Sequence, residues 1–255
     1  MKKNVLFVQP ERCYRKFVGD TNTLKPGDIV PATVQDYDFL NQILHCKVGN
    51  TTAYIRNENI SYPAQSEKTY RYLIGKQIIA ELVEIYPNGS LELNRKKIIK
   101  STFNYLSNSI GTIVKATVEN FASYGTFVDI GNGITSLLLL KDSSICRYSK
   151  PYFYFNRGDK ISLKITGFDP ISNHFFVSRK EAYALDYPKV HSVVTVKCCQ
   201  TLNTSSAGVF VEYNPRTTGI MDIPKDLYFA ENTEVFCFIK KITSKGFKAN
   251  FLSFV

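Results

Sequence analysis

Residues 121–140, FASYGTFVDIGNGITSLLLL, constrain this chain more than any other stretch. Tyr124, Thr126, Val128 and Ile130 alternate with the residues between them, with the period of two expected of a strand whose two faces differ. Asn132-Gly133 follows, a dipeptide that accepts positive φ at both central turn positions. The pattern predicts a β-hairpin with a well-defined register.

The flanking segments add three more short strands to this hairpin. Residues 113–118 (IVKATV) precede it, and ISLKITGFD and HFFVSRK follow after a long polar and aromatic connection. Five short strands with a long connection between the third and fourth are typical of an oligonucleotide-binding (OB) barrel, whose binding face lies on strands two and three.

This segment resembles the S1-type RNA-binding domain. Several short motifs occur in the family's order, which is more specific than any one of them alone. The matching stretches are Gly111 to Val114, Tyr124 to Val128, Gly133 to Leu138, Gly158 to Lys160, Phe168-Asp169 and Val177 to Lys180.

The same strand pattern recurs upstream and downstream with a period of roughly 80 residues, as repeated modules would give. We therefore predict an all-β protein of three tandem five-stranded OB-type barrels, the outer two diverged, with a short helical linker between the first and second. In the linker Ile99, Phe103, Leu106 and Ile110 recur at helical spacing. The expected division is an N-terminal extension 1–23, a first barrel 24–94, the linker 95–108, a central S1 domain 109–181 and a third barrel 182–255.

Composition excludes several classes of protein. No apolar run approaches the roughly 18 residues of a membrane span. The six cysteines are scattered, without a Cys-x-x-Cys pair, and the chain has 3 histidines, so no metal site or other cofactor is expected. We expect a cytoplasmic monomer whose cysteines are reduced and mostly buried.

The net charge of +10 is unevenly distributed along the chain. The first barrel carries −2 and the helical linker +4, whereas residues 109–188 carry +2 and residues 189–255 carry +3. Affinity for a polyanion comes mostly from Lys and Arg at phosphates, so the first barrel alone is a poor platform for nucleic acid.

The resemblance to S1 domains implies which residues would face RNA. The two aromatic residues of the family's Phe-Gly-x-Phe motif fall on Tyr124 and Phe127, and Phe121 could extend the platform. The stacking role competes with a place in the barrel core, above all for Phe127. The remaining candidates are the family's acidic and basic positions near the last hairpin, Asp169 with Asn173 or His174, and the phosphate contacts Lys141, Arg179 and Lys180. The family's His position is Leu139 here, which cannot donate a hydrogen bond.

The outer copies are less well equipped by the same comparison. In the first copy the aromatic positions fall on Gln42 and His45 and the His position on Arg56, so polar contacts without stacking are expected there. In the third they fall on Ala207 and Phe210, and Asp222 at the His position would repel phosphate. Secondary RNA contacts are predicted at Arg56, His45, Lys96 and Lys97.

The resulting function is a non-catalytic RNA-binding protein, similar to short multi-domain S1 proteins of bacteria. It would hold single-stranded RNA, with mRNA at the ribosome as one candidate target and with no membrane or small-molecule partner. An alternative is a protein-interaction or ribosome-assembly scaffold whose RNA face is degenerate. A less favoured alternative is an accessory subunit of a ribonuclease, because the three copies use up the chain and Asp36-x-Asp38 lacks further metal ligands.

Overall fold

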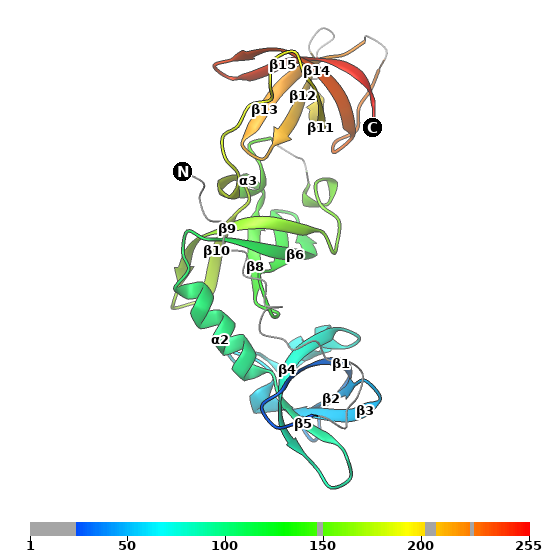
Figure 1. Cartoon of the computed structure of the whole chain (residues 1–255), viewed down its shortest axis with the longest axis vertical. Coiled ribbons are helices and arrows are strands. Elements are labelled where there is room, and N and C mark those ends of the chain that lie inside the picture. Colours follow the sequence, from blue (N-terminus) through cyan, green and yellow to red (C-terminus); the bar gives the residue numbers. More distant parts are fainter. Residues whose placement is uncertain (1–23, 147–149, 202–207, 225–226) are drawn as a thin grey trace. The chain divides into compact units, whose positions relative to one another are not determined.

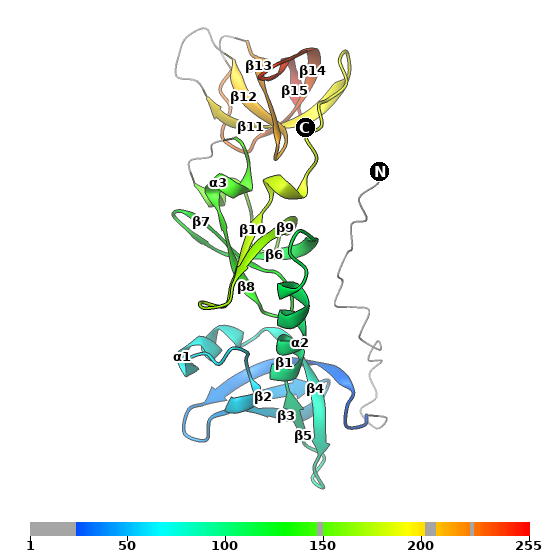
Figure 2. The same ribbon diagram turned by 90° about the vertical axis from the view of Figure 1, so that its left-hand side faces the viewer.

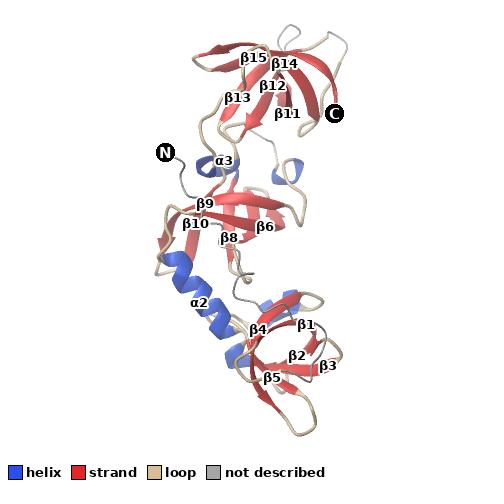
Figure 3. Ribbon diagram, viewed as in Figure 1, coloured by secondary structure: helices blue, strands red, loops and turns tan. Residues whose placement is uncertain are grey.

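The computed structural model describes residues 24–146, 150–201, 208–224 and 227–255. Strands dominate the described chain, with a few short helices (Figure 3). They form three closed five-stranded barrels with one strand order (Figure 1), which confirms the predicted all-β class and the tandem barrels. The chain divides into two compact units, one containing the first barrel, α2 and Ile130–Ile134, and the other containing the central and third barrels.

The first barrel pairs its strands in the order β1-β2-β3-β5-β4. Alternation in ILHCKV shows how the sequence makes these strands, because Leu44, Cys46 and Val48 enter the core while His45 and Lys47 face outward. Its strands are β1 (Ile29–Asp38), β2 (Ile43–Val48), β3 (Thr51–Arg56), β4 (Gln77–Ile85) and β5 (Leu91–Asn94), and its short helices are η3 (Asn57–Asn59), α1 (Glu67–Tyr70) and η4 (Arg71–Leu73).

A single long helix, α2 (Lys96–Ser107), connects the first and central barrels in sequence. Its apolar stripe consists of Ile99, Phe103 and Leu106, all buried, as the spacing predicts. Ile110 was expected to continue the stripe, but it lies beyond the end of the helix and is exposed. The helix ends at Ser107 and is capped by Asn108, whose backbone N–H bonds to the Asn104 carbonyl at 3.3 Å.

The central barrel has the order β6-β7-β8-β10-β9, and Figure 2 labels its five strands. Val128 and Leu138 point into its interior, where a fully buried leucine contributes about 2 kcal/mol. Asn132 and Gly133 both have positive φ, which confirms the predicted turn. The strands are β6 (Ile113–Ala122), β7 (Gly125–Asp129), β8 (Thr135–Leu139), β9 (Lys160–Asp169) and β10 (His174–Ser178), with α3 (Leu140–Ser143), η5 (Pro151–Phe153) and η6 (Lys180–Ala182) between or after them.

The third barrel repeats the order as β11-β12-β13-β15-β14. Its core includes Val211, Met221, Cys237 and Phe247. Gly219 is required where it stands, because a Cβ there would meet the Phe247 ring at 2.4 Å. The strands are β11 (Val193–Thr201), β12 (Val209–Asn214), β13 (Thr217–Asp222), β14 (Glu234–Thr243) and β15 (Gly246–Phe254).

Cysteine pairing is one point at which the structure corrects the sequence analysis. Cys146 and Cys199 form a disulfide across 53 residues of sequence, whereas Cys46, Cys198 and Cys237 are free and buried as expected. The bonded pair joins the segment after α3 to β11. Sequence spacing could not reveal it, because the two cysteines meet only where two barrels of one unit pack together.

Candidate nucleic-acid interface

A row of outward-facing positions crosses four strands of the central barrel. Phe127 of β7 is paired with Leu137 of β8, Leu137 with Phe176 of β10, and Phe176 with Gly167 of β9. We call these four residues the central outer row. Phe127 is half-buried while its neighbours Thr126 and Val128 are buried, so the strand's alternation directs the ring outward and away from the core.

Phe176 is the aromatic ring of this row that the sequence analysis did not predict. Phe175 is 3% exposed and Phe176 57%, so the two adjacent rings lie on opposite faces of β10. A Cβ added to Gly167 would lie 3.4 Å from the Phe176 ring, which shows that the ring rests beside the open backbone of β9. Alternation in HFFVS is the signal that could have identified it.

The two rings of the central outer row lie two strands apart, with Leu137 between them. Neighbouring strands are about 4.8 Å apart, so the two backbones are separated by about 10 Å. At this separation each ring can contact a different planar group.

Tyr124 lies in the turn just before β7 and is 56% exposed. Its carbonyl accepts a hydrogen bond of 3.1 Å from the Leu140 N–H, which ties the turn to the end of β8. Phe121 is half-buried on β6, paired with Thr126. Leu139 is paired with Gly125, where a Cβ would come within 2.6 Å of the Leu138 carbonyl oxygen.

The β9–β10 hairpin contains the predicted Asp169, Asn173 and His174. The Asp169 carboxylate accepts hydrogen bonds from the Ser172 hydroxyl and, at 3.0 Å, from the Ile171 N–H. These bonds hold the Asp169 pKa below its usual value. Asn173 takes the positive φ of the turn, and His174 is exposed opposite Asp169. The Asp169 carboxylate therefore stabilises the turn of the β9–β10 hairpin.

Two of the predicted phosphate contacts remain at the surface. Lys141 is exposed on α3 and Lys180 is half-buried at the start of η6. Neither forms an ion pair within the described part of the chain. Both are thus able to offer a cation to a phosphate.

Arg179 is not available for that role, and here the prediction needs correction. Its side chain is 15% exposed, and it donates to the Tyr154 hydroxyl and, at 3.5 Å, to Glu212 of the third barrel. The guanidinium carbon also lies 4.8 Å from the centre of the Tyr154 ring. We call Ser144, Tyr154, Arg179 and Glu212 the junction cluster, because it joins the central barrel to the third within one unit.

The junction cluster is tightly hydrogen-bonded. The Tyr154 hydroxyl donates to Glu212 at 2.5 Å, and the Ser144 hydroxyl donates to the other oxygen of the same carboxylate. Burial, together with the neighbouring carboxylate, raises the pKa of Tyr154 and keeps the phenol neutral. Sequence gave no indication of the cluster, because its members lie up to 68 positions apart.

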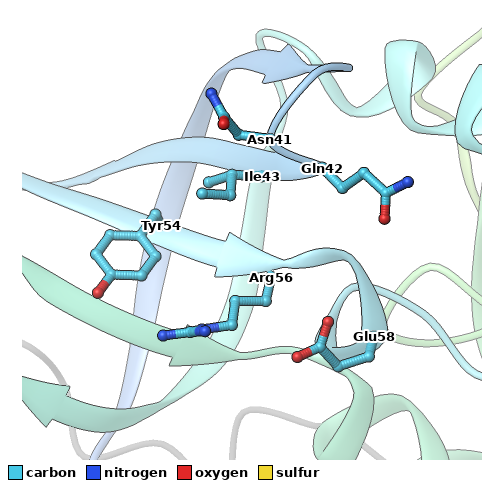
Figure 4. Close-up of a pocket in the computed structure, with 6 residues that line it drawn as sticks. All are labelled: Asn41, Gln42, Ile43, Tyr54, Arg56 and Glu58. Carbon is cyan, nitrogen blue, oxygen red and sulfur yellow. The ribbon is translucent and has the colours of Figure 1, made fainter.

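The equivalent row of the first barrel is acidic. His45, Tyr54, Glu92 and Glu84 occupy the positions that the central outer row fills with Phe127, Leu137, Phe176 and Gly167. Beside this row Asn41, Gln42, Ile43, Tyr54, Arg56 and Glu58 line a hollow of about 350 Å³ (Figure 4). Tyr54 is an aromatic residue at a place where no ring was expected, although the surrounding charge is negative.

Two of the four residues predicted as secondary RNA contacts form ion pairs with carboxylates. Arg56 donates to Glu92 at 2.9 Å, and Lys97 to Glu81 at 2.7 Å. Burial of Glu92 raises its pKa, but hydrogen bonds from Tyr86 and Arg56 outweigh this effect and leave the pKa low. His45 is exposed on β2 and Lys96 is half-buried at the start of α2. Arg56 and Lys97 thus each balance a carboxylate of their own barrel, but their side chains are 53% and 67% exposed, so their assignment as phosphate contacts stays a prediction.

Metal-ligand clusters and membrane-spanning helices are absent from the described residues. The described residues contain no group of three or more His, Cys, Asp and Glu side chains arranged to hold a metal ion. Of the helices in the described ranges, none is both long and apolar enough to cross a bilayer. The expected aromatic position Ala207 lies outside the described residues.

Three tandem OB-type barrels, one of them with an exposed aromatic row, define a protein of the OB-barrel class. Residues 108–180 match the family described as the S1 RNA binding domain, which covers the whole central barrel. The central barrel is thus an S1-type domain, and the chain is similar to the small ribosomal subunit protein bS1.

Two curated relatives show the extent of that similarity. The bS1 protein of Leuconostoc lactis is 30% identical over 165 residues, covering 58% of this chain and 37% of the relative. The bS1 protein of Helicobacter pylori strain J99 is 33% identical over 123 residues, covering 47% of this chain and 22% of the relative. The chain therefore spans roughly a third or less of the length of these relatives.

Among solved structures, a multidomain protein with nucleic acid binding domains from Streptococcus pneumoniae aligns over 88% of this chain and 73% of its own. The sequence identity is 12% and the TM-score 0.32.

Proposed function

We propose that this protein is a non-catalytic RNA-binding protein whose central barrel holds single-stranded RNA by stacking. The observation that carries the proposal is the pair of outward rings Phe127 and Phe176 on an S1-type domain, with exposed Tyr124 at the edge of β7. Aromatic rings stack on unpaired bases at about 1–3 kcal/mol each, whatever the base.

The electrostatics of the central barrel support the same proposal. Lys141 and Lys180 supply cations, and the outer row contains no carboxylate. Hydrogen bonds to the bases are sparse, because Leu139 occupies the family's His position. Binding is therefore weakly selective for sequence, and the contacts are mainly to base faces and phosphates.

Similarity to bS1 supports a setting at the ribosome, with mRNA as the RNA, and a cytoplasmic location is part of the proposal. The competing role, a scaffold with a degenerate RNA face, is favoured by the acidic row of the first barrel and by Leu139. The two roles make different predictions for RNA binding by the intact chain.

The test is a titration of the intact chain with fluorescent single-stranded RNA over a series of salt concentrations. Tyr124→Ala/Phe127→Ala should weaken binding by about tenfold or more, because two stacking surfaces are removed. Lys141→Ala should instead reduce the slope of log K against log salt by about one. Tyr152→Ala is the matched control, since this exposed ring of the same barrel lies on η5 and is not a member of the row. Equal affinity of wild type and the double variant would leave the scaffold role as the better account.

A further inference from the structure

The third barrel has an outer row of its own, built by the same strand pairings as the central one. Phe210 of β12 is paired with Ile220 of β13, Ile220 with Lys248 of β15, and Lys248 with Lys241 of β14. We call these four residues the third outer row. Phe210 occupies the place of Phe127, and the two lysines stand where the central barrel has Phe176 and Gly167.

The side chains of this row are accessible. Phe210 is 37% exposed, although its neighbours Val209 and Val211 are buried in the core. Lys241 and Lys248 are both exposed, and neither forms an ion pair within the described ranges. One ring and two neighbouring cations thus share a single face of the sheet.

Asp222 was expected to repel phosphate from this face. Its carboxylate accepts a hydrogen bond from the Lys240 ammonium at 3.0 Å, so the negative charge has a cationic partner. With Lys241 and Lys248 beside this pair, the net charge of the four groups is positive. The objection drawn from the sequence therefore does not hold for the folded barrel.

We propose that the third outer row is a second binding site for single-stranded RNA, with Phe210 stacking on a base and Lys241 and Lys248 contacting phosphates. The choice of RNA as the ligand rests on the proposed function of the central barrel. An aromatic ring followed by cations along a sheet is the chemistry that holds an unpaired strand. The first barrel lacks this chemistry, because Glu92 and Glu84 occupy the positions of the two lysines.

The two RNA sites would act together. The central and third barrels belong to one compact unit joined by the junction cluster, so an RNA bound at one site stays at high local concentration near the other. Loss of the third outer row should therefore weaken binding of a long single strand even while the central row is intact.

The experiment uses the intact chain and a fluorescent single-stranded RNA homopolymer in a salt series. Phe210→Ala/Lys248→Ala should lower affinity by about tenfold or more and reduce the salt slope by about one. Lys241→Gln/Lys248→Gln keeps the ring and should reduce the slope by about two, which covers the case in which the Phe210 variant fails to fold. Tyr228→Ala/Lys245→Ala is the matched control, because it removes an exposed ring and an exposed lysine of the same barrel outside the row.

Placing the third-row changes on a Phe127→Ala/Phe176→Ala background separates this inference from the proposed function. Residual RNA binding of that background, lost when Phe210 and Lys248 are also replaced, supports the second site. Unchanged affinity and slope in the third-row variants, with a clear loss in the central ones, would overturn it and leave the central function standing. An equal loss in the control would also overturn it, since diffuse charge would then explain the binding.

Discussion

Replacing Arg179 with alanine tests the junction cluster most directly. Arg179 and Glu212 are 15% and 4% exposed, and their charged atoms are 3.5 Å apart. At an effective dielectric constant of 20 their attraction is about 5 kcal/mol, before the cost of removing both charges from water. Alanine would leave Glu212 buried without its cation, which costs about 3–5 kcal/mol in proteins.

The assay should report on the two joined barrels separately from the first, because a chain of several barrels does not unfold in one step. Hydrogen–deuterium exchange, followed by mass spectrometry on peptides covering β10 and β12, meets this need. A loss of 3–5 kcal/mol corresponds to exchange that is faster by a factor on the order of a hundred to several thousand. Peptides of the first barrel should exchange as in the wild type.

Lys164→Ala is the matched control for Arg179→Ala. Lys164 pairs with Glu181 at 2.9 Å, but their side chains are 32% and 52% exposed, so its loss should cost about 1 kcal/mol or less. Arg179→Met/Glu212→Leu removes both charges and should recover most of the protection, although Tyr154 then loses its acceptor. If Arg179→Ala exchanged no faster than Lys164→Ala, the argument that burial makes this pair stabilising would be refuted.

Phe176→Ala should weaken binding of single-stranded RNA by about tenfold and leave the salt slope unchanged, as measured by the same fluorescence titration, because an exposed ring is lost and no charge. Burial raises the pKa of the Cys46 and Cys198 thiols from 9.0 to about 12, with Cys237 adding to the effect at Cys198. In the unfolded chain these thiols ionise at a lower pH than in the folded protein. The stability that the buried, neutral thiols contribute is therefore complete below pH 9, and it falls by about 1.4 kcal/mol per thiol and pH unit as the pH rises toward 12. Urea unfolding with serine variants of these thiols would check this, and a pH-independent midpoint above pH 9 would contradict it. Peptide mapping without reductant should recover the Cys146–Cys199 link, and Cys146→Ser should destabilise the joined barrels by about 4 kcal/mol, the closure entropy of a loop of 53 residues. Free thiols at both positions in the oxidised protein would rule the link out.

Much of the fold follows from local pattern. Period-two alternation in ILHCKV and in GTFVD assigns the buried and exposed faces of β2 and β7. Asn132-Gly133 predicts its turn because only a few residue types accept positive φ. The helical spacing of Ile99, Phe103 and Leu106 places α2 correctly, but it fails at Ile110, because the helix already ends at Ser107 with Asn108 as its cap.

The candidate site was only partly predictable. Tyr124 and Phe127 were predicted from one motif of five residues, whereas the resemblance to the family rests on several motifs in order. Phe176 was not predicted as part of the site, because its place beside Leu137 depends on the parallel pairing of β8 with β10. The cationic partner of Asp222 could not be read from local pattern either, because Lys240 lies 18 positions away in sequence.

The sequence by itself determined the strands, their faces and the repeat of three barrels, since these depend on the chemistry of residues a few positions apart. Only the tertiary structure decided which charges have a counter-ion in the folded protein. Arg179 and Arg56 have the same guanidinium as any phosphate-binding arginine, yet each is held by a carboxylate more than 30 positions away. Whether a charge faces solvent or a counter-ion is a property of packing, and local sequence does not encode it.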